Sequence, residues 1–235
     1  MNGILIVDKP EGWTSHDVVA KLRGALKMKR IGHGGTLDPM ATGVLPIFIG
    51  LATKLSGTST EANKEYIAGL RLGVVTDTQD ITGQILSETN STVTAAELAE
   101  ILPRFTGTIQ QIPPMYSAKK QGGKKLYELA RKGIEVAREP RTITIHTLEL
   151  LESPQSETQN SSDFILNVLC SKGTYVRTLC HDIGAALGTG GTMSSLRRTC
   201  SGEHKIEHAH TLENILTAID NDEFAKLLIE VEHGT

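Results

Sequence analysis

The spacing of hydrophobic residues along the chain predicts strands alternating with helices, without an internal repeat. Strands are expected where apolar residues are continuous or alternate with polar ones, at 4–7, 44–49, 66–72, 84–88, 142–150 and 164–170. Helices are expected where apolar residues recur every three or four positions, at 15–28, 94–102, 124–132 and 175–187. Ser15 and Thr94 are placed to cap the first two helices. This mixture indicates an α+β fold with one extended, largely antiparallel sheet flanked by helices.

Composition places the protein among ordinary globular chains. Its 235 residues are 39% hydrophobic and 22% charged, and no linker is sharp enough to mark a second domain. No apolar run approaches the 18 residues of a membrane helix, and the short apolar N-terminus predicts a first strand rather than a signal peptide. The three cysteines form no C-x-x-C motif, which favours free thiols and a cytoplasmic location. The polar stretch 152–162 is expected to be a mobile surface loop.

Charge is unevenly distributed although the net charge is only −3. The segment 104–132 has a single acid, Glu128, and seven cations: Arg104, Lys119, Lys120, Lys124, Lys125, Arg131 and Lys132. The tail after Gly202 has the opposite balance, with eight acids against two lysines. A basic segment on an acidic protein suits a polyanionic partner, although a solvated charged face fits the same pattern.

Asp38 is the residue with the most specific local setting. It follows the glycine-rich stretch Gly32–Gly35 and precedes Pro39, whose ring fixes the backbone angle φ. Such a turn can present a carboxylate to a substrate at a defined angle. The same residues also fit an ordinary turn, because Asp before Pro commonly starts one.

Several other kinds of site are not indicated. The glycines at 32, 34 and 35 lack the spacing of a dinucleotide-binding fingerprint, and no Gly-Lys-Ser/Thr follows them. His204, His208 and His210 lie close in sequence but have no zinc-ligand pattern, so they are interpreted as surface histidines. No Gly-x-Ser-x-Gly elbow is present.

The stretch GHGGTLDPMATGVLP at 32–46 closely resembles the active-site motif of the TruB family of RNA pseudouridine synthases. Further similarities follow in family order: VDKPEGWTS at 7–15, KEYIA at 64–68, QIPPMYSA at 111–118 with GKKLY at 123–127, CSKGTYVRT at 170–178 and LRR at 196–198. Together they span about residues 4–200, nearly the whole catalytic unit of the family.

The resemblance implies a pseudouridine synthase catalytic fold and a role for each matching residue. Asp38 would be the catalytic nucleophile, Tyr66 would stack on the target base and accept the C5 proton, and Arg177 would hold Asp38 ionised. Tyr175 and Leu196 would line the uracil pocket, and His33 would help to displace the flipped nucleotide. The reaction is an isomerisation without redox change, so no cofactor or metal is expected.

The implied substrate is uridine 55 in the T-arm of tRNA. Its base must be extruded from a folded loop at a cost of a few kcal/mol, which phosphate contacts offset. A thumb-like insertion at about 103–132 is expected to grip the RNA. The expected RNA contacts are Lys9, Lys64, Lys119, Lys120, Lys124, Lys125, Arg131 and Lys132. The protein is expected to act as a monomer, without guide RNA and without a membrane.

The expected catalytic domain covers 1–200, and 201–235 is expected to form a short, acidic, helical extension. Leu212, Ile215, Leu216 and Ile219 suggest one helix there, and Phe224, Leu227 and Leu228 another. This length is too short for the complete PUA RNA-binding domain that family members commonly carry.

Two alternatives share parts of this pattern. A guide-RNA-dependent rRNA synthase of the Cbf5/dyskerin type has the same Asp motif but no comparable thumb insertion. A tRNA-binding chaperone without catalysis would not need Asp38, Tyr66 and Arg177, all of which are present.

Overall fold

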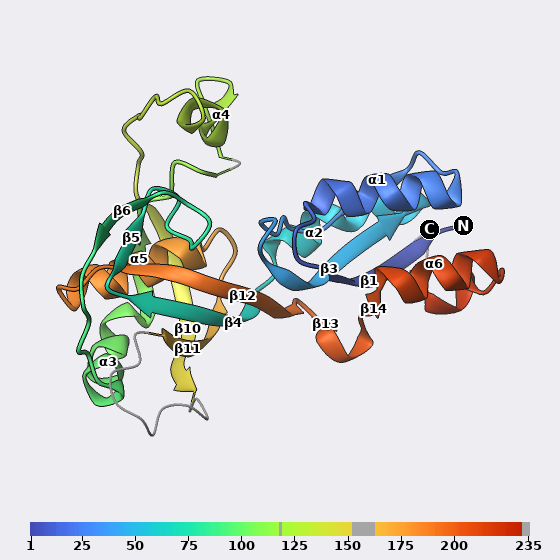
Figure 1. The fold of residues 1–235 in the computed structure, drawn as a ribbon. Helices are drawn as coiled ribbons and strands as arrows, with labels where there is room; N and C mark the ends of the chain where they lie inside the picture. The colour runs from blue at the N-terminus through green and yellow to red at the C-terminus, as the bar shows by residue number, and fades with distance from the viewer. Residues whose placement is uncertain (118, 152–162, 232–235) are drawn as a thin grey trace. The chain divides into compact units, whose positions relative to one another are not determined.

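The structure is a computed structural model that describes residues 1–117, 119–151 and 163–231. The chain forms two compact units, drawn in Figure 1. Unit 1 contains Met1–Tyr66 and the C-terminal segment from Leu196, and unit 2 contains Ile67–Ser195. The boundaries fall inside two strands, β4 (Lys64–Leu72) and β12 (Gly191–Ser201), where no change in composition marks them. This grouping differs from the domain over 1–200 that the sequence predicts.

Unit 1 is built on a mixed sheet. Strand β1 (Gly3–Lys9) pairs antiparallel with β3 (Thr42–Ile49), which pairs antiparallel with β2 (Ile31–His33) and parallel with the end of β12. Both faces of β1 and β3 are buried, which explains their nearly continuous apolar sequences. Helix α1 (Ser15–Leu26) buries Val18, Val19 and Leu22, and η1 (Gly50–Leu55) and α2 (Ser56–Glu61) follow β3.

The first helix begins at Ser15, but its capping residue lies one position earlier than expected. Thr14, not Ser15, is its N-cap: the Thr14 hydroxyl accepts from the Asp17 N–H at 3.0 Å, and the Asp17 carboxylate accepts from the Thr14 N–H at 2.8 Å. Asp17 lies three residues after Thr14, the spacing of a capping box, which explains the difference. The cap predicted at Thr94 for α3 (Ala95–Ile101) is confirmed.

The acidic tail is part of unit 1 rather than an extension from it. Strand β14 (His210–Thr211) pairs parallel with β1, and Ile229 exchanges two backbone hydrogen bonds with Ile4. The two expected helices correspond to α6 (Leu212–Asp220) and the short 3-10 helix η4 (Phe224–Leu227). Strand β13 (His204–Lys205) and η3 (Ile206–His208) lead into them.

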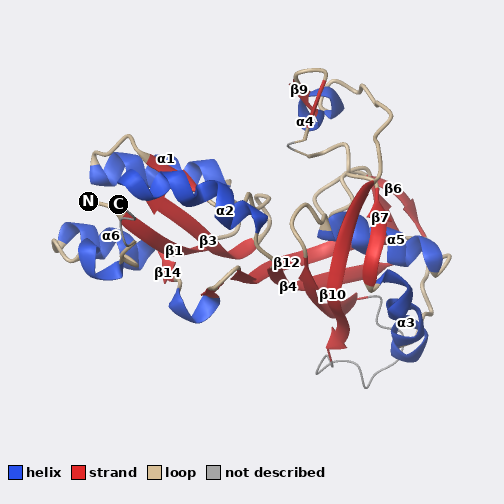
Figure 2. Cartoon of the chain, turned by 180° about the vertical axis from the view of Figure 1, so that it is seen from behind, coloured by secondary structure: helices blue, strands red, loops and turns tan. Residues whose placement is uncertain are grey.

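Unit 2 contains an antiparallel core of three strands. Strand β10 (Arg141–Leu151) pairs with β11 (Asp163–Cys170) on one side and β7 (Gly107–Gln111) on the other. The strand order is β12-β4-β11-β10-β7, and β5 (Val74–Thr76) forms a separate hairpin with β6 (Ile85–Glu88). Helices α3, η2 (Leu102–Phe105) and α5 (Val176–Ala186) complete the unit (Figure 2). The loop predicted at 152–162 lies outside the described residues.

The chain leaves this sheet between β7 and β10. This thumb segment (residues 112–140) contains the short strands β8 (Lys120–Gln121) and β9 (Lys124–Lys125) and helix α4 (Leu126–Ala130). In Figure 1, α4 stands clear of strands β4, β10 and β11. The thumb expected from residue 103 therefore begins later, because 102–105 form η2 and 107–111 form β7. A hydrogen bond joins the two ends of the thumb segment: Arg138 Nη1 donates to the Pro113 carbonyl at 3.2 Å.

Candidate active site

Asp38 lies in unit 1 on the loop between β2 and β3, and Arg198 braces the two ends of that loop. The Arg198 side chain is 1% exposed. Its Nη2 donates to the Gly35 carbonyl at 3.2 Å, and its Nε donates to the Val44 carbonyl at 2.7 Å. Gly43 packs so closely that an added Cβ would lie 2.2 Å from the Arg198 carbonyl oxygen. A buried, planar donor thus joins Gly35, near the start of the loop, to Val44 in β3, on the other side of Asp38.

Lys9 supports the same loop from inside the protein. Its side chain is fully buried, and its ammonium donates to the carbonyls of Pro10, Trp13 and Pro39 at 2.8, 2.7 and 3.2 Å. Burial lowers the pKa of Lys9 to about 8, while the negative charge of Asp38 acts in the opposite direction. The group therefore stays largely protonated at neutral pH and holds the residue that follows Asp38.

Lys64 has a similar internal position. Its side chain is 6% exposed, and its ammonium donates to the carbonyls of Ser59, Thr60 and Ala62 at 3.2, 2.6 and 2.7 Å. Lys9 and Lys64 are both expected from the sequence to contact RNA phosphates. The structure corrects this expectation, because buried ammonium groups that already donate to three carbonyls are not available at the surface. Sequence alone cannot tell such a lysine from an exposed one.

His33 lies at the end of β2 beside a second histidine that the sequence reading does not single out. The rings of His33 and His16 meet edge to face, with centroids 5.1 Å apart. Burial, together with the positive charges of His16 and Arg198, lowers the pKa of His33 to about 4. His33 is therefore neutral at physiological pH, and its buried Nδ1 has no hydrogen-bond partner among the described residues.

Tyr66 and Leu196 are the remaining predicted site residues of unit 1. Tyr66 lies on β4 and Leu196 on β12, and each side chain is 9% exposed. Both are therefore mostly buried on strands, which limits the movement of the side chains.

Unit 2 contains Arg177, in the first turn of α5. Its guanidinium is 3.5 Å from the Asp80 carboxylate, and the two side chains are only 6% and 7% exposed. Arg177 also donates to the carbonyls of Thr78 and Tyr116, at 3.1 and 2.7 Å. Asp80 is a partner of Arg177 that the sequence analysis does not predict. The acidic turn DTQD at 77–80 is the only signal for it, and such turns are common at surfaces.

Tyr175 immediately precedes α5, and the side chain of Gln111 holds the main chain of Tyr175. The side-chain amide of Gln111 accepts from the Tyr175 N–H at 2.8 Å and donates to the Tyr175 carbonyl at 3.1 Å. Gln111 is 2% exposed and is the last residue of β7. The start of α5, and with it Arg177, is therefore fixed to the edge strand of the sheet.

The predicted RNA-contacting cations of unit 2 lie on the thumb segment. Lys124 and Lys132 are exposed, whereas Lys119 is half-buried. The charged ends of Lys125 and Arg131 both lie over the ring of Tyr127, at 5.5 and 5.3 Å from its centroid. The side chain of Lys120 lies outside what the structure describes. The thumb thus presents a local cluster of positive charge around one aromatic ring.

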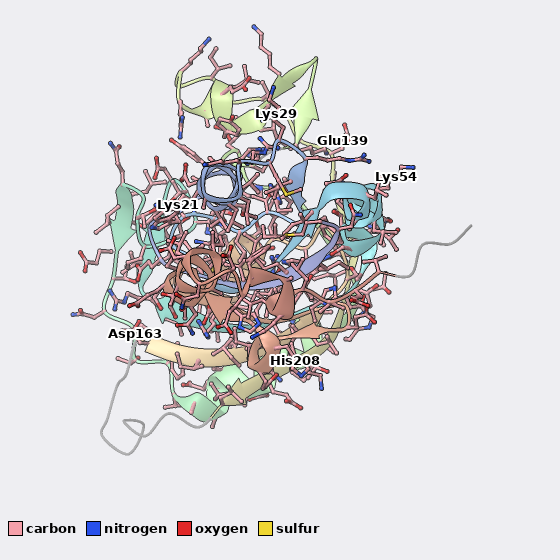
Figure 3. All side chains as sticks on the ribbon, turned by 90° about the vertical axis from the view of Figure 1, so that its right-hand side faces the viewer. Lys21, Lys29, Lys54, Glu139, Asp163 and His208 are labelled. Carbon is pink, nitrogen blue, oxygen red and sulfur yellow. The ribbon has the colours of Figure 1, made fainter. Side chains whose placement is uncertain are left out.

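A second group of cations lies on unit 1 and was not singled out from the sequence. Residues 18–37 contain no acid and five cations: Lys21, Arg23, Lys27, Lys29 and Arg30. All five side chains are exposed, as is Lys54. Figure 3, in which the right-hand side of Figure 1 faces the viewer, labels Lys21, Lys29 and Lys54. The absence of acids from this stretch is the sequence signal that could have revealed the group.

No helix within residues 1–117, 119–151 and 163–231 is long and apolar enough to cross a membrane. The same residues contain no group of three or more His, Cys, Asp or Glu side chains arranged to hold a metal ion.

Comparison with known proteins identifies the family. Residues 23–176 match the model of the TruB family pseudouridylate synthase N-terminal domain, and residues 177–233 match that of the tRNA pseudouridylate synthase B C-terminal domain. The chain belongs to the TruB family. TruB proteins are pseudouridine synthases, which are isomerases, and the α+β fold and enzyme class expected from the sequence are thereby confirmed.

Individual relatives agree with this assignment. The chain is 52% identical over 223 residues to tRNA pseudouridine synthase B of Alkaliphilus oremlandii, covering 95% of this chain and 72% of the relative. It is 49% identical to the enzyme of that name from an Azoarcus species, with 91% and 69% covered. Among solved structures, a Cbf5–Nop10–Gar1 complex matches with a TM-score of 0.75 and 33% identity. That match covers 97% of this chain and 59% of the other.

Proposed function

We propose that this TruB-family protein converts uridine 55 in the T-arm of tRNA to pseudouridine, with Asp38 as the nucleophile. The bond between uracil N1 and ribose C1′ breaks, the base turns, and C1′ joins C5, which then loses its proton. The observation that carries this proposal is the carboxylate-bearing loop of a pseudouridine synthase, braced at both ends by buried Arg198. A fixed carboxylate can stabilise positive charge that develops at C1′.

The other predicted residues complete the proposed chemistry. Tyr66 stacks on the base and accepts the C5 proton, Tyr175 and Leu196 line the pocket, and Arg177 keeps Asp38 ionised. His33 helps to displace the flipped nucleotide. Its neutral state supports that role, because an uncharged ring can replace a base in a stack without a large desolvation cost.

The proposed RNA grip is the thumb segment. Its cations on 119–132 contact phosphates, and the protein acts as a monomer. Two observations favour action on tRNA without guide RNA. Relatives named tRNA pseudouridine synthase B are 44–52% identical to this chain, against 33% for Cbf5. The chain also has a thumb segment between β7 and β10.

The test is an assay on a synthetic T-arm RNA without any guide RNA. Pseudouridine should form at position 55 and nowhere else, and an RNA with cytidine at that position should yield none. Absence of product from the wild-type protein, or product only when a guide RNA is added, would overturn the proposal.

A further inference from the structure

Ser15 makes a buried contact whose partner is the residue next to Asp38. The Ser15 side chain is 1% exposed. Its hydroxyl accepts from the Leu37 N–H at 2.9 Å and donates to the Leu37 carbonyl at 3.3 Å. Leu37 is itself 3% exposed. One hydroxyl therefore engages both polar groups of the main chain that leads into Asp38.

Helix formation does not account for this contact. Thr14 and Asp17 already satisfy the start of α1 through their capping box. Within the described part of the chain, the Ser15 hydroxyl makes no hydrogen bond to another residue of α1. It points instead to a loop 22 positions further along the chain. Serine at the first helical position is thus used for the loop that carries Asp38.

A second anchor lies on the other side of Asp38. The Gly12 N–H donates to the Pro39 carbonyl at 2.8 Å, and the Lys9 ammonium donates to the same carbonyl at 3.2 Å. The backbone of Asp38 is thereby fixed between Leu37, held by Ser15, and Pro39, held by Gly12 and Lys9. The anchor at Leu37 can be removed by a single side-chain substitution.

We propose that Ser15 is a positioning residue for Asp38. The inference rests on the proposed function of Asp38 as nucleophile. Without the hydroxyl, the buried N–H and carbonyl of Leu37 lose their partner, and the loop can relax toward water to satisfy them. A displacement of about 1 Å at a reacting group can lower a rate by about 100-fold. Substrate binding should change little, because Ser15 itself is buried away from solvent.

The test compares Ser15→Ala with Thr14→Ala, two adjacent losses of a hydroxyl at the start of one helix. Ser15→Ala should lower the kcat for T-arm RNA by about 10- to 100-fold with KM within about threefold. Thr14→Ala should lower Tm by about 1–8 °C, as expected for a lost cap, and leave kcat within about twofold. Hydrogen exchange in the full chain should show faster exchange of the Leu37 amide in Ser15→Ala only.

The outcomes separate the two claims. If the wild-type protein forms no pseudouridine, the proposed function fails. If the wild type is active and the kcat of Ser15→Ala lies within about twofold of that of Thr14→Ala, the positioning role fails. Ser15→Cys serves the same test if Ser15→Ala does not fold, because the thiol fills the space but is a weak hydrogen-bonding group. Its kcat should then fall in the same direction, and a wild-type kcat would overturn the proposal.

Discussion

Substitution of Gly43 by Ala should destabilise unit 1 strongly for a change of one methyl group. Gly43 has φ +99°, and an added Cβ would lie 2.2 Å from the carbonyl oxygen and 2.9 Å from the nitrogen of Arg198. The left-handed conformation costs about 1–2 kcal/mol for a residue with a Cβ. Forcing backbone apart in a packed region costs about 1–3 kcal/mol more. The free energy of unfolding should therefore fall by about 2–5 kcal/mol.

Thermal unfolding measures this effect, and Gly24→Ala is the matched control. At about 2–4 °C per kcal/mol for a chain of this size, Gly43→Ala should lower Tm by about 4–20 °C. Gly24 lies in α1, and beyond its neighbours and the backbone of that helix no atom lies within 4 Å of an added Cβ, so Gly24→Ala should stabilise by about 0.5–1 kcal/mol. Equal Tm values for the two variants would refute the close packing of β3 against β12. Gly43→Ala should also lose activity at temperatures below its Tm, because Arg198 braces the Asp38 loop.

Two other predictions concern charge. The double variant Lys124→Ala with Lys125→Ala should bind RNA more weakly, and the slope of log affinity against log salt concentration should fall by up to about two units. The control Lys205→Ala with Lys226→Ala, in the acidic tail, should change neither quantity. Equal salt slopes for the two double variants would exclude phosphate contacts by the thumb lysines. The pKa of His33 is about 4 in the folded protein and 6.5 ordinarily. Between these pH values the unfolded chain binds a proton at His33 that the folded chain does not. The free energy of unfolding should therefore decrease as the pH falls from about 6.5 to about 4, by no more than about 3 kcal/mol. Urea titrations across this range should show a shallower decrease for His33→Gln, and identical curves would contradict the lowered pKa.

The sequence predicts the elements whose hydrophobic pattern is strong. Helix α5 and strands β1, β3, β10 and β11 agree with the predicted ranges to within a few residues. Strand β12 was not predicted as a strand, because its sequence GTMSSLRRTCS alternates weakly and contains two adjacent arginines. Its ends lie in different units, and tertiary packing, including the burial of Arg198, decides its conformation.

The candidate site shows the same limit. Family motifs locate Asp38, but they do not say which neighbours hold its loop, because those contacts join residues far apart in the chain. Lys9 has the appearance of a surface cation in the sequence and is fully buried in the structure. Ser15 has the appearance of a helix cap, yet it binds Leu37. Asp80 has no periodic signal at all, and only its contact with Arg177 reveals it.

The most direct test of the central claim is a single-turnover assay of Asp38→Asn on T-arm RNA, with Asp220→Asn as the control. Asp220 ends α6 and is exposed, so its variant should match the wild type in rate and in RNA binding. Asp38→Asn keeps the shape of the side chain and should bind the RNA normally, but it should form no pseudouridine. A rate for Asp38→Asn within about tenfold of the wild type would contradict the assignment of Asp38 as the nucleophile.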